Sequence, residues 1–151
     1  MKSFFKVGLL FWFSALVLVS CGSDDNGPTT PASIIAKWTP TRTVISANGG
    51  NISSNYTGNE PGCDKDYIEF TAGNAFNNVV FFRDATNTCT ASAAEPATYT
   101  KTENTLVITG DIYGGSYQIV RLTNTELQIE IEETNAGVTT KTTRFFTKVA
   151  Q

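Results

Sequence analysis

Short runs in which apolar and polar residues alternate restrict this chain to a β-rich fold. In Leu127–Ile131, three apolar residues share one face of an extended chain and two polar residues share the other. Thr, Val, Ile, Tyr and Phe are abundant from residue 34 onward, and no stretch there repeats its apolar residues every 3.6 positions. The sequence therefore predicts an all-β domain.

Residues 34–151 are expected to form one domain, because a segment of this length is too short for two hydrophobic cores. The expected strands are Ile35–Ser46, Ile52–Tyr56, Tyr67–Phe70, Ala75–Arg83, Ala97–Thr100, Leu106–Ile108, Tyr117–Leu122, Leu127–Ile131 and Val138–Val149. Pro40 has no N–H to donate, so the first strand should be an edge, bulged or broken there. The spacing suits an antiparallel barrel of about eight strands or a β-sandwich, and does not choose between them.

The amino terminus predicts export and a lipid anchor. Two lysines precede an apolar run, Val7–Val19, which is shorter than a membrane-spanning helix and ends in small residues. The segment Leu18–Cys21 resembles the lipobox of bacterial lipoproteins. That resemblance implies a signal peptide over residues 1–20 and an acylated Cys21, whose lipid would hold the chain at a membrane.

Residues 21–33 are expected to be a flexible tether, because they are rich in Gly, Ser, Asp, Thr and Pro and contain no large apolar residue. Ser23-Asp24-Asp25 resembles the export signal of Bacteroidetes lipoproteins, so the domain is placed at the outer membrane, either surface-exposed or facing the periplasm. Loss of residues 1–20 changes the net charge from −3 to −5, because it removes two lysines and no acid. The remaining basic residues are scattered, which argues against a nucleic-acid partner.

Cys63 and Cys89 are expected to form a disulfide, because an exported domain left with two cysteines oxidises them. The bridge would close the open ends of a β-hairpin. Cys63 begins the segment Cys63-Asp-Lys-Asp66, which also suggests a metal or redox site. The segment supplies too few ligands for a metal and has no Cys-x-x-Cys spacing, so no metal site is predicted.

No enzymatic activity and no cofactor are predicted. The chain has no histidine, so a serine or cysteine nucleophile lacks its usual base. The carboxylates that could serve a glycosidase are Asp64 and Asp66, or Glu130, Glu132 and Glu133. Asp64 and Asp66, with Glu60 and Glu69 nearby, also offer oxygen ligands for calcium. Glu130 and Glu132 should face solvent, because they alternate with buried residues.

Several segments together resemble the lipocalin-like domains of Bacteroidetes lipoproteins: Ile35-Ala-Lys-Trp38, Cys63-Asp-Lys-Asp66, "TLVITG" at 105–110, "YQIVRLTNTELQIE" at 117–130 and a closing "RFFTKV". The resemblance implies a small meandering antiparallel β-barrel whose interior takes an apolar ligand. The aromatic candidates to line that interior are Trp38, Phe70, Phe76, Phe82, Tyr99, Tyr117 and Phe146. Ordinary core packing explains each of them equally well.

Two functions remain open from the sequence. The first is a lipid-anchored envelope protein that binds a small apolar or amphiphilic ligand in its barrel. The second is a structural or interaction protein with a filled barrel, whose partner is another envelope protein or a glycan. An apolar cavity of some hundreds of cubic ångströms would favour the first, and a solid interior the second.

Overall fold

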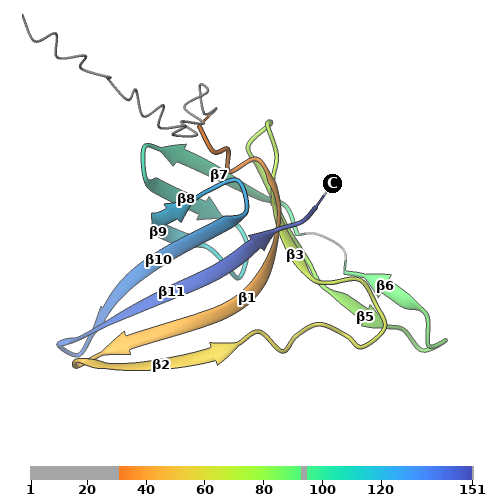
Figure 1. Ribbon diagram of the computed structural model, residues 1–151, viewed down its shortest axis with the longest axis horizontal. Helices are drawn as coiled ribbons and strands as arrows, with labels where there is room; N and C mark the ends of the chain where they lie inside the picture. The colour runs from red at the N-terminus through yellow and green to blue at the C-terminus, as the bar shows by residue number, and fades with distance from the viewer. Residues whose placement is uncertain (1–30, 93–94, 151) are drawn as a thin grey trace, which may run out of the picture. The chain divides into compact units, whose positions relative to one another are not determined.

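Eleven strands follow one another along the part of the chain that the structure describes, and most of them pair with a neighbour in sequence (Figure 1). The computed structural model describes residues 31–92 and 95–150. The strands are β1 (Ala36–Ala47), β2 (Gly50–Asn55), β3 (Tyr67–Phe70), β4 (Ala75–Val79), β5 (Phe81–Arg83), β6 (Cys89–Ala91), β7 (Ala97–Thr102), β8 (Thr105–Thr109), β9 (Gly115–Leu122), β10 (Glu126–Asn135) and β11 (Val138–Lys148).

Eight strands close into an antiparallel barrel in the order β1-β3-β4-β7-β8-β9-β10-β11. The ring closes where β11 pairs with β1, from Trp38 opposite Lys148 to Ala47 opposite Thr140. The predicted meandering barrel is therefore confirmed. The β-sandwich alternative is wrong, because a sheet that pairs with its own first strand encloses its core instead of stacking on a second sheet.

The hydrophobic core fills the inside of this ring. Five of its side chains have no exposed surface: Trp38, Phe76, Leu106, Leu127 and Ile129. The alternation predicted at the start of β10 is confirmed, since Leu127 and Ile129 point into the core and Gln128 between them is only half-buried. Burial of large apolar side chains, at about 1.5 to 3 kcal/mol each, is the main force that holds the barrel together.

Pro40 bulges the first strand, as predicted. β3 pairs with β1 over residues 36–38 and β2 pairs with it over residues 42–47, so Pro40 lies in the interval between these two partners. The register with β11 shifts between Pro40 and Arg42. A residue without an N–H is tolerated here because this edge of β1 changes partner at that point.

Strands β1, β2, β10 and β11 continue beyond the barrel as a four-stranded sheet, here called the extension (residues 43–47, 50–54, 131–135 and 138–143; Figure 1). Two tight turns end it, at Asn48-Gly49 and Ala136-Gly137, and all four turn residues have positive φ. Such turns match the right-handed twist of a hairpin. All of β2 is exposed, which the sequence did not indicate.

The predicted strand Ala75–Arg83 is two strands. β4 stays in the barrel, whereas β5 leaves it and pairs with β6 in a separate hairpin, which stands apart from the extension in Figure 1. The break lies at Val80, whose N–H donates to the Ser92 hydroxyl at 3.0 Å instead of to the barrel sheet. β6 was not predicted, because three residues are too few for a recognisable alternation.

Candidate functional site

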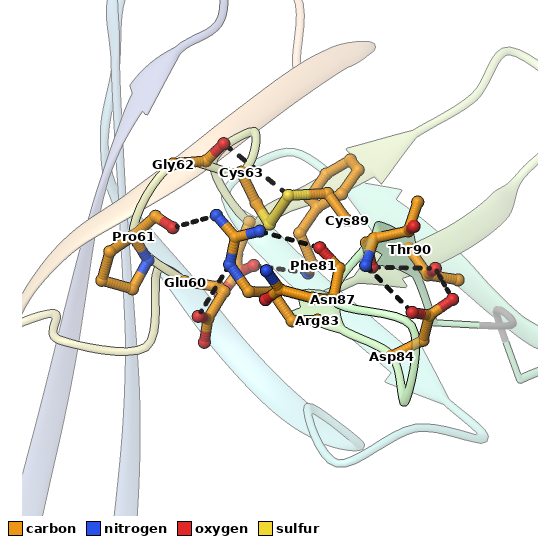
Figure 2. Close-up of a disulfide and its surroundings, with 12 residues drawn as sticks. Glu60, Pro61, Gly62, Cys63, Phe81, Arg83, Asp84, Asn87, Cys89 and Thr90 are labelled. Carbon is orange, nitrogen blue, oxygen red and sulfur yellow. Dashed lines mark hydrogen bonds and ion pairs between the residues drawn. A yellow bond between two sulfur atoms is a disulfide. The ribbon is translucent and has the colours of Figure 1, made fainter.

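The predicted disulfide between Cys63 and Cys89 is present, with Cα atoms 5.5 Å apart (Figure 2). It joins the loop before β3 to the first residue of β6, so it does not close the ends of a barrel hairpin as expected. Arg83 reinforces the same connection. Its guanidinium donates to the carbonyl of Pro61 at 3.0 Å and lies 3.6 Å from the carboxylate of Glu60. Loop and hairpin are therefore fastened at several points.

Asp66 directly precedes β3 and is a buried structural carboxylate. Only 2% of its surface is exposed. It accepts the hydroxyl of Tyr56 at 2.5 Å and the backbone N–H of Phe81 at 2.7 Å, and its own N–H donates to the Asn59 side chain at 3.0 Å. Burial and this hydrogen bond raise the pKa of Tyr56. Asp66 thus holds the loop after β2 against the start of β5.

Three of the remaining carboxylates pair with cations. Glu60 pairs with Arg83, while Glu130 and Glu132 lie 3.5 Å and 3.1 Å from the ammonium of Lys141. Glu130 and Glu132 face the outside of the sheet, as predicted. Within residues 31–92 and 95–150, no three His, Cys, Asp or Glu side chains gather in a way that would hold a metal ion.

Six of the seven aromatic residues proposed to line the barrel point inward and are buried: Trp38, Phe70, Phe76, Tyr99, Tyr117 and Phe146. They pack against one another, with the Phe70 ring 5.2 Å from Phe76 and 4.9 Å from Tyr99. The prediction that Phe82 points inward is wrong, because Phe82 lies on the β5–β6 hairpin with 43% of its surface exposed. Ligand contact by the other six stays a prediction.

The polar atoms of these aromatic residues bind the protein's own backbone. The indole N–H of Trp38 donates to the Ile34 carbonyl at 2.8 Å, and the hydroxyl of Tyr99 donates to the Thr71 carbonyl at 2.8 Å. The hydroxyl of Tyr117 donates to the Tyr113 carbonyl at 2.9 Å. Buried tyrosine and tryptophan need such partners, so these contacts are what a packed core requires.

Tyr113 covers one end of the core. It lies in the loop between β8 and β9 with 9% of its surface exposed, and its ring is 5.9 Å from Phe76 and 6.4 Å from Phe146. Burial raises the pKa of the Tyr113 hydroxyl. In the sequence, Tyr113-Gly-Gly115 predicts only a turn. A large aromatic residue beside two glycines was the one signal that this turn folds back over the core.

Arg144 lies above Tyr113, with its guanidinium carbon 5.1 Å from the centre of that ring. It sits in β11 between Thr43 and Ile129, so it shares the inward face with the core residue Ile129. Its Nε atom is buried and has no hydrogen-bond partner among the described residues. Arg144, Tyr113 and Tyr56 border a cavity of about 50 Å³. A buried N–H without an acceptor is costly, so this atom calls for a water molecule or an anion.

A row of isoleucines follows Arg144 on the same face of the extension. The row crosses four paired strands. Ile52 of β2 pairs with Ile45 of β1, and Ile45 pairs with Thr142 of β11. Thr142 in turn pairs with Ile131 of β10. Ile52 and Ile45 expose 69% and 42% of their surfaces, whereas Ile131 packs against the core. We call Tyr113, Arg144 and these three isoleucines the mouth of the barrel. It combines a cation, whose buried Nε has no hydrogen-bond partner among the described residues, with an exposed apolar strip.

Cys21, the predicted site of acylation, lies outside the described residues. The described residues contain no helix that is both long and apolar enough to cross a membrane.

Comparison with known proteins assigns the family. Residues 34–129 match the sequence profile of the family described as lipocalin-like domain, which is more than half of the chain. A bovine lipocalin allergen, Bos d 2, is similar in structure, with a TM-score of 0.41 and 14% sequence identity over 78% of this chain and 74% of the allergen. No match was found among curated protein sequences. The chain belongs to the lipocalin-like domain family.

Proposed function

We propose that this protein is a lipid-anchored component of a bacterial outer membrane that binds a small amphiphile at the mouth of its barrel. The ligand would carry an acidic head group and an apolar tail. The family favours small-molecule binding in general. The observation that carries this more specific proposal is Arg144, a cation at the end of an apolar core whose buried Nε has no partner among the described residues.

The head group of the ligand would bind Arg144. An arginine binds a carboxylate with short, charge-assisted hydrogen bonds. The cavity beside Arg144 has room for a few small atoms but not for a hydrocarbon chain. The tail would therefore lie outside it, on the exposed isoleucines at 45 and 52, which continue the same face.

Replacement of Arg144 should weaken binding of an acid but not of the matching alcohol. We expect Arg144→Gln to raise the dissociation constant for oleate about tenfold or more, because a hydrogen bond to a charged group contributes about 1.5 to 3 kcal/mol. Oleyl alcohol should bind equally to both proteins, and Ile52→Ser should weaken both ligands. Isothermal titration calorimetry on residues 22–151 measures these constants.

Arg121→Gln is the matched control, because Arg121 is an exposed arginine that pairs with Glu126 on the outside of the barrel. The proposal is wrong if Arg144→Gln binds oleate as tightly as the unmodified chain does. If neither ligand binds, the second function suggested by the sequence, an interaction protein with a filled barrel, is the better account. The close packing of the six interior aromatics favours that alternative.

The lipid anchor rests on the resemblance of Leu18–Cys21 to a lipobox. We expect Cys21→Ser to move the protein from the membrane fraction to the soluble fraction and to abolish the added mass of acyl chains on the mature terminus. Fractionation followed by intact-mass spectrometry checks both results. Thr29→Ala, in the predicted tether, should leave the protein at the membrane. An unchanged distribution of Cys21→Ser would exclude the anchor.

A further inference from the structure

A groove lies outside the barrel. It has a volume of about 650 Å³ and runs between the outer face of β1, the end of β11 and the disulfide-linked loop before β3. Its charged residues are Lys37, Lys65, Lys148 and Asp64, and its aromatic residues are Tyr67 and Phe81. None of these residues was among the seven aromatic residues that the sequence predicted to line the barrel interior. The groove and the mouth share no residue.

The groove is positively charged on a negatively charged protein. Lys37 and Lys65 against Asp64 leave one positive charge in excess, while the chain from residue 21 onward carries −5. Lys148 borders the groove at the end of β11, on the face that it shares with Trp38. In the part of the chain that the structure describes, none of the three lysines lies within 4 Å of a carboxylate. Their charges are therefore available to a ligand. Such a local excess attracts anions despite the opposite net charge of the whole molecule.

One lysine is held in place by an aromatic wall. The ammonium of Lys37 is 3.3 Å from the hydroxyl of Tyr67 and 4.4 Å from the centre of its ring. The ring of Phe81 is 6.2 Å from that of Tyr67. Both rings are half-buried, so an apolar group in the groove would cover their remaining surface.

The opposite wall is fixed by the covalent and buried contacts of the loop. Asp64 and Lys65 stand between Cys63, which forms the disulfide, and Asp66, which is buried. The floor is barrel sheet, in which the N–H of Val149 donates to the carbonyl of Lys37 at 2.9 Å. A site whose walls are already fixed loses little conformational entropy when a ligand binds.

We propose that this groove binds a phosphate monoester whose phosphate is joined to an aromatic or other apolar group. A phosphate monoester carries a charge of about −2 at neutral pH, which the two ammonium groups of Lys37 and Lys65 can neutralise. Lysine binds phosphate as a point charge, so these two groups need no fixed relative orientation. Tyr67 and Phe81 supply the surface for the attached group. A soluble phosphorylated molecule and a lipid phosphate head group both have this chemistry.

Phenyl phosphate tests the site on the mature chain held in phosphatidylcholine nanodiscs. We expect it to bind more tightly than inorganic phosphate, because only the ester covers the aromatic wall, and phenol should not bind. Lys37→Gln and Lys65→Gln should each raise its dissociation constant about three- to fivefold, the range for partly exposed charge pairs. Their effect should shrink as salt is raised from 50 to 300 mM.

Lys101→Gln is the matched control, because Lys101 is an exposed lysine on β7 outside the groove. Nanodiscs that contain phosphatidic acid test whether the ligand is a lipid. If it is, phosphatidic acid should protect Lys37 and Lys65 from acetylation, and phenyl phosphate should bind weakly. Either probe supports the site if it responds to both groove lysines. The proposal fails if neither probe binds, or if Lys101→Gln has the same effect. Arg144→Gln should not alter either result, which separates this site from the mouth.

Discussion

Removal of the disulfide is expected to lower the free energy of unfolding by about 3 to 4 kcal/mol. The double variant Cys63→Ser, Cys89→Ser leaves the chain free to separate two points that are 26 residues apart in sequence. In the chain-entropy account, the bridge already restricts the unfolded chain. Folding of the bridged chain therefore does not lose the entropy of closing a loop of that size. Urea denaturation followed by tryptophan fluorescence measures the difference, because Trp38 is wholly buried in the folded core.

The same experiment has an internal control. Reduction of the unmodified protein with dithiothreitol should give the stability of the double variant, and the reductant should not change the double variant itself. The midpoint should fall while the slope of the transition rises slightly, since an unbridged unfolded chain exposes more surface. A loss below about 1 kcal/mol would show that the contacts of Arg83 with Pro61 and Glu60 hold the loop without the bridge.

The barrel was predictable because strand alternation and tight turns are local signals. Leu127–Ile131 alternates as a half-buried strand must, and the turns at Asn48-Gly49 and Ala136-Gly137 each contain a glycine, which accepts positive φ. The closing pair of β1 and β11 joins residues about 100 positions apart, and no local pattern encodes it. The choice between barrel and sandwich came from family resemblance, and the structure confirms it.

The candidate sites were less predictable because they depend on contacts between distant segments. Sequence reasoning took Phe82 as an interior residue, since it alternates with Phe81 as if the strand were continuous. The strand leaves the barrel after Val79, which moves Phe82 to the surface and Phe81 to the groove. Arg144 is a charged residue between Thr143 and Phe145, and nothing in the sequence marks it as an inward-facing residue. Only the fold places it above Tyr113.

The segment Cys63-Asp-Lys-Asp66 shows how neighbouring residues acquire different roles. Its cysteine is bridged and its last carboxylate is buried. The two residues between them are exposed and border the groove. A motif that suggested a metal or redox site is therefore a structural clamp that presents one lysine and one aspartate to solvent. Its two anchors have separable energetic contributions, which variants of Asp66 can measure.

Replacement of Asp66 with alanine is expected to destabilise the fold by about 3 kcal/mol. The change leaves the hydroxyl of Tyr56 and the N–H of Phe81 without their acceptor, and each such group costs about 1 to 3 kcal/mol when buried. Asp66→Asn should cost less, because its amide oxygen still accepts one of the two donors. Asp64→Ala is the matched control and should change stability by less than about 0.5 kcal/mol, because Asp64 is exposed.

Alkaline pH provides a second measurement of the same contact. The pKa of Tyr56 is raised in the folded protein, by burial first and by Asp66 second. Its neutral form therefore stabilises the fold fully below pH 10, the ordinary tyrosine value, and this contribution is lost as the pH rises above 10. Tyr56→Phe should remove that part of the alkaline loss, although Tyr99, Tyr113 and Tyr117 retain theirs. If the stability of Tyr56→Phe and of the unmodified protein falls in parallel from pH 9 to 11, the phenol does not depend on Asp66 as the structure indicates.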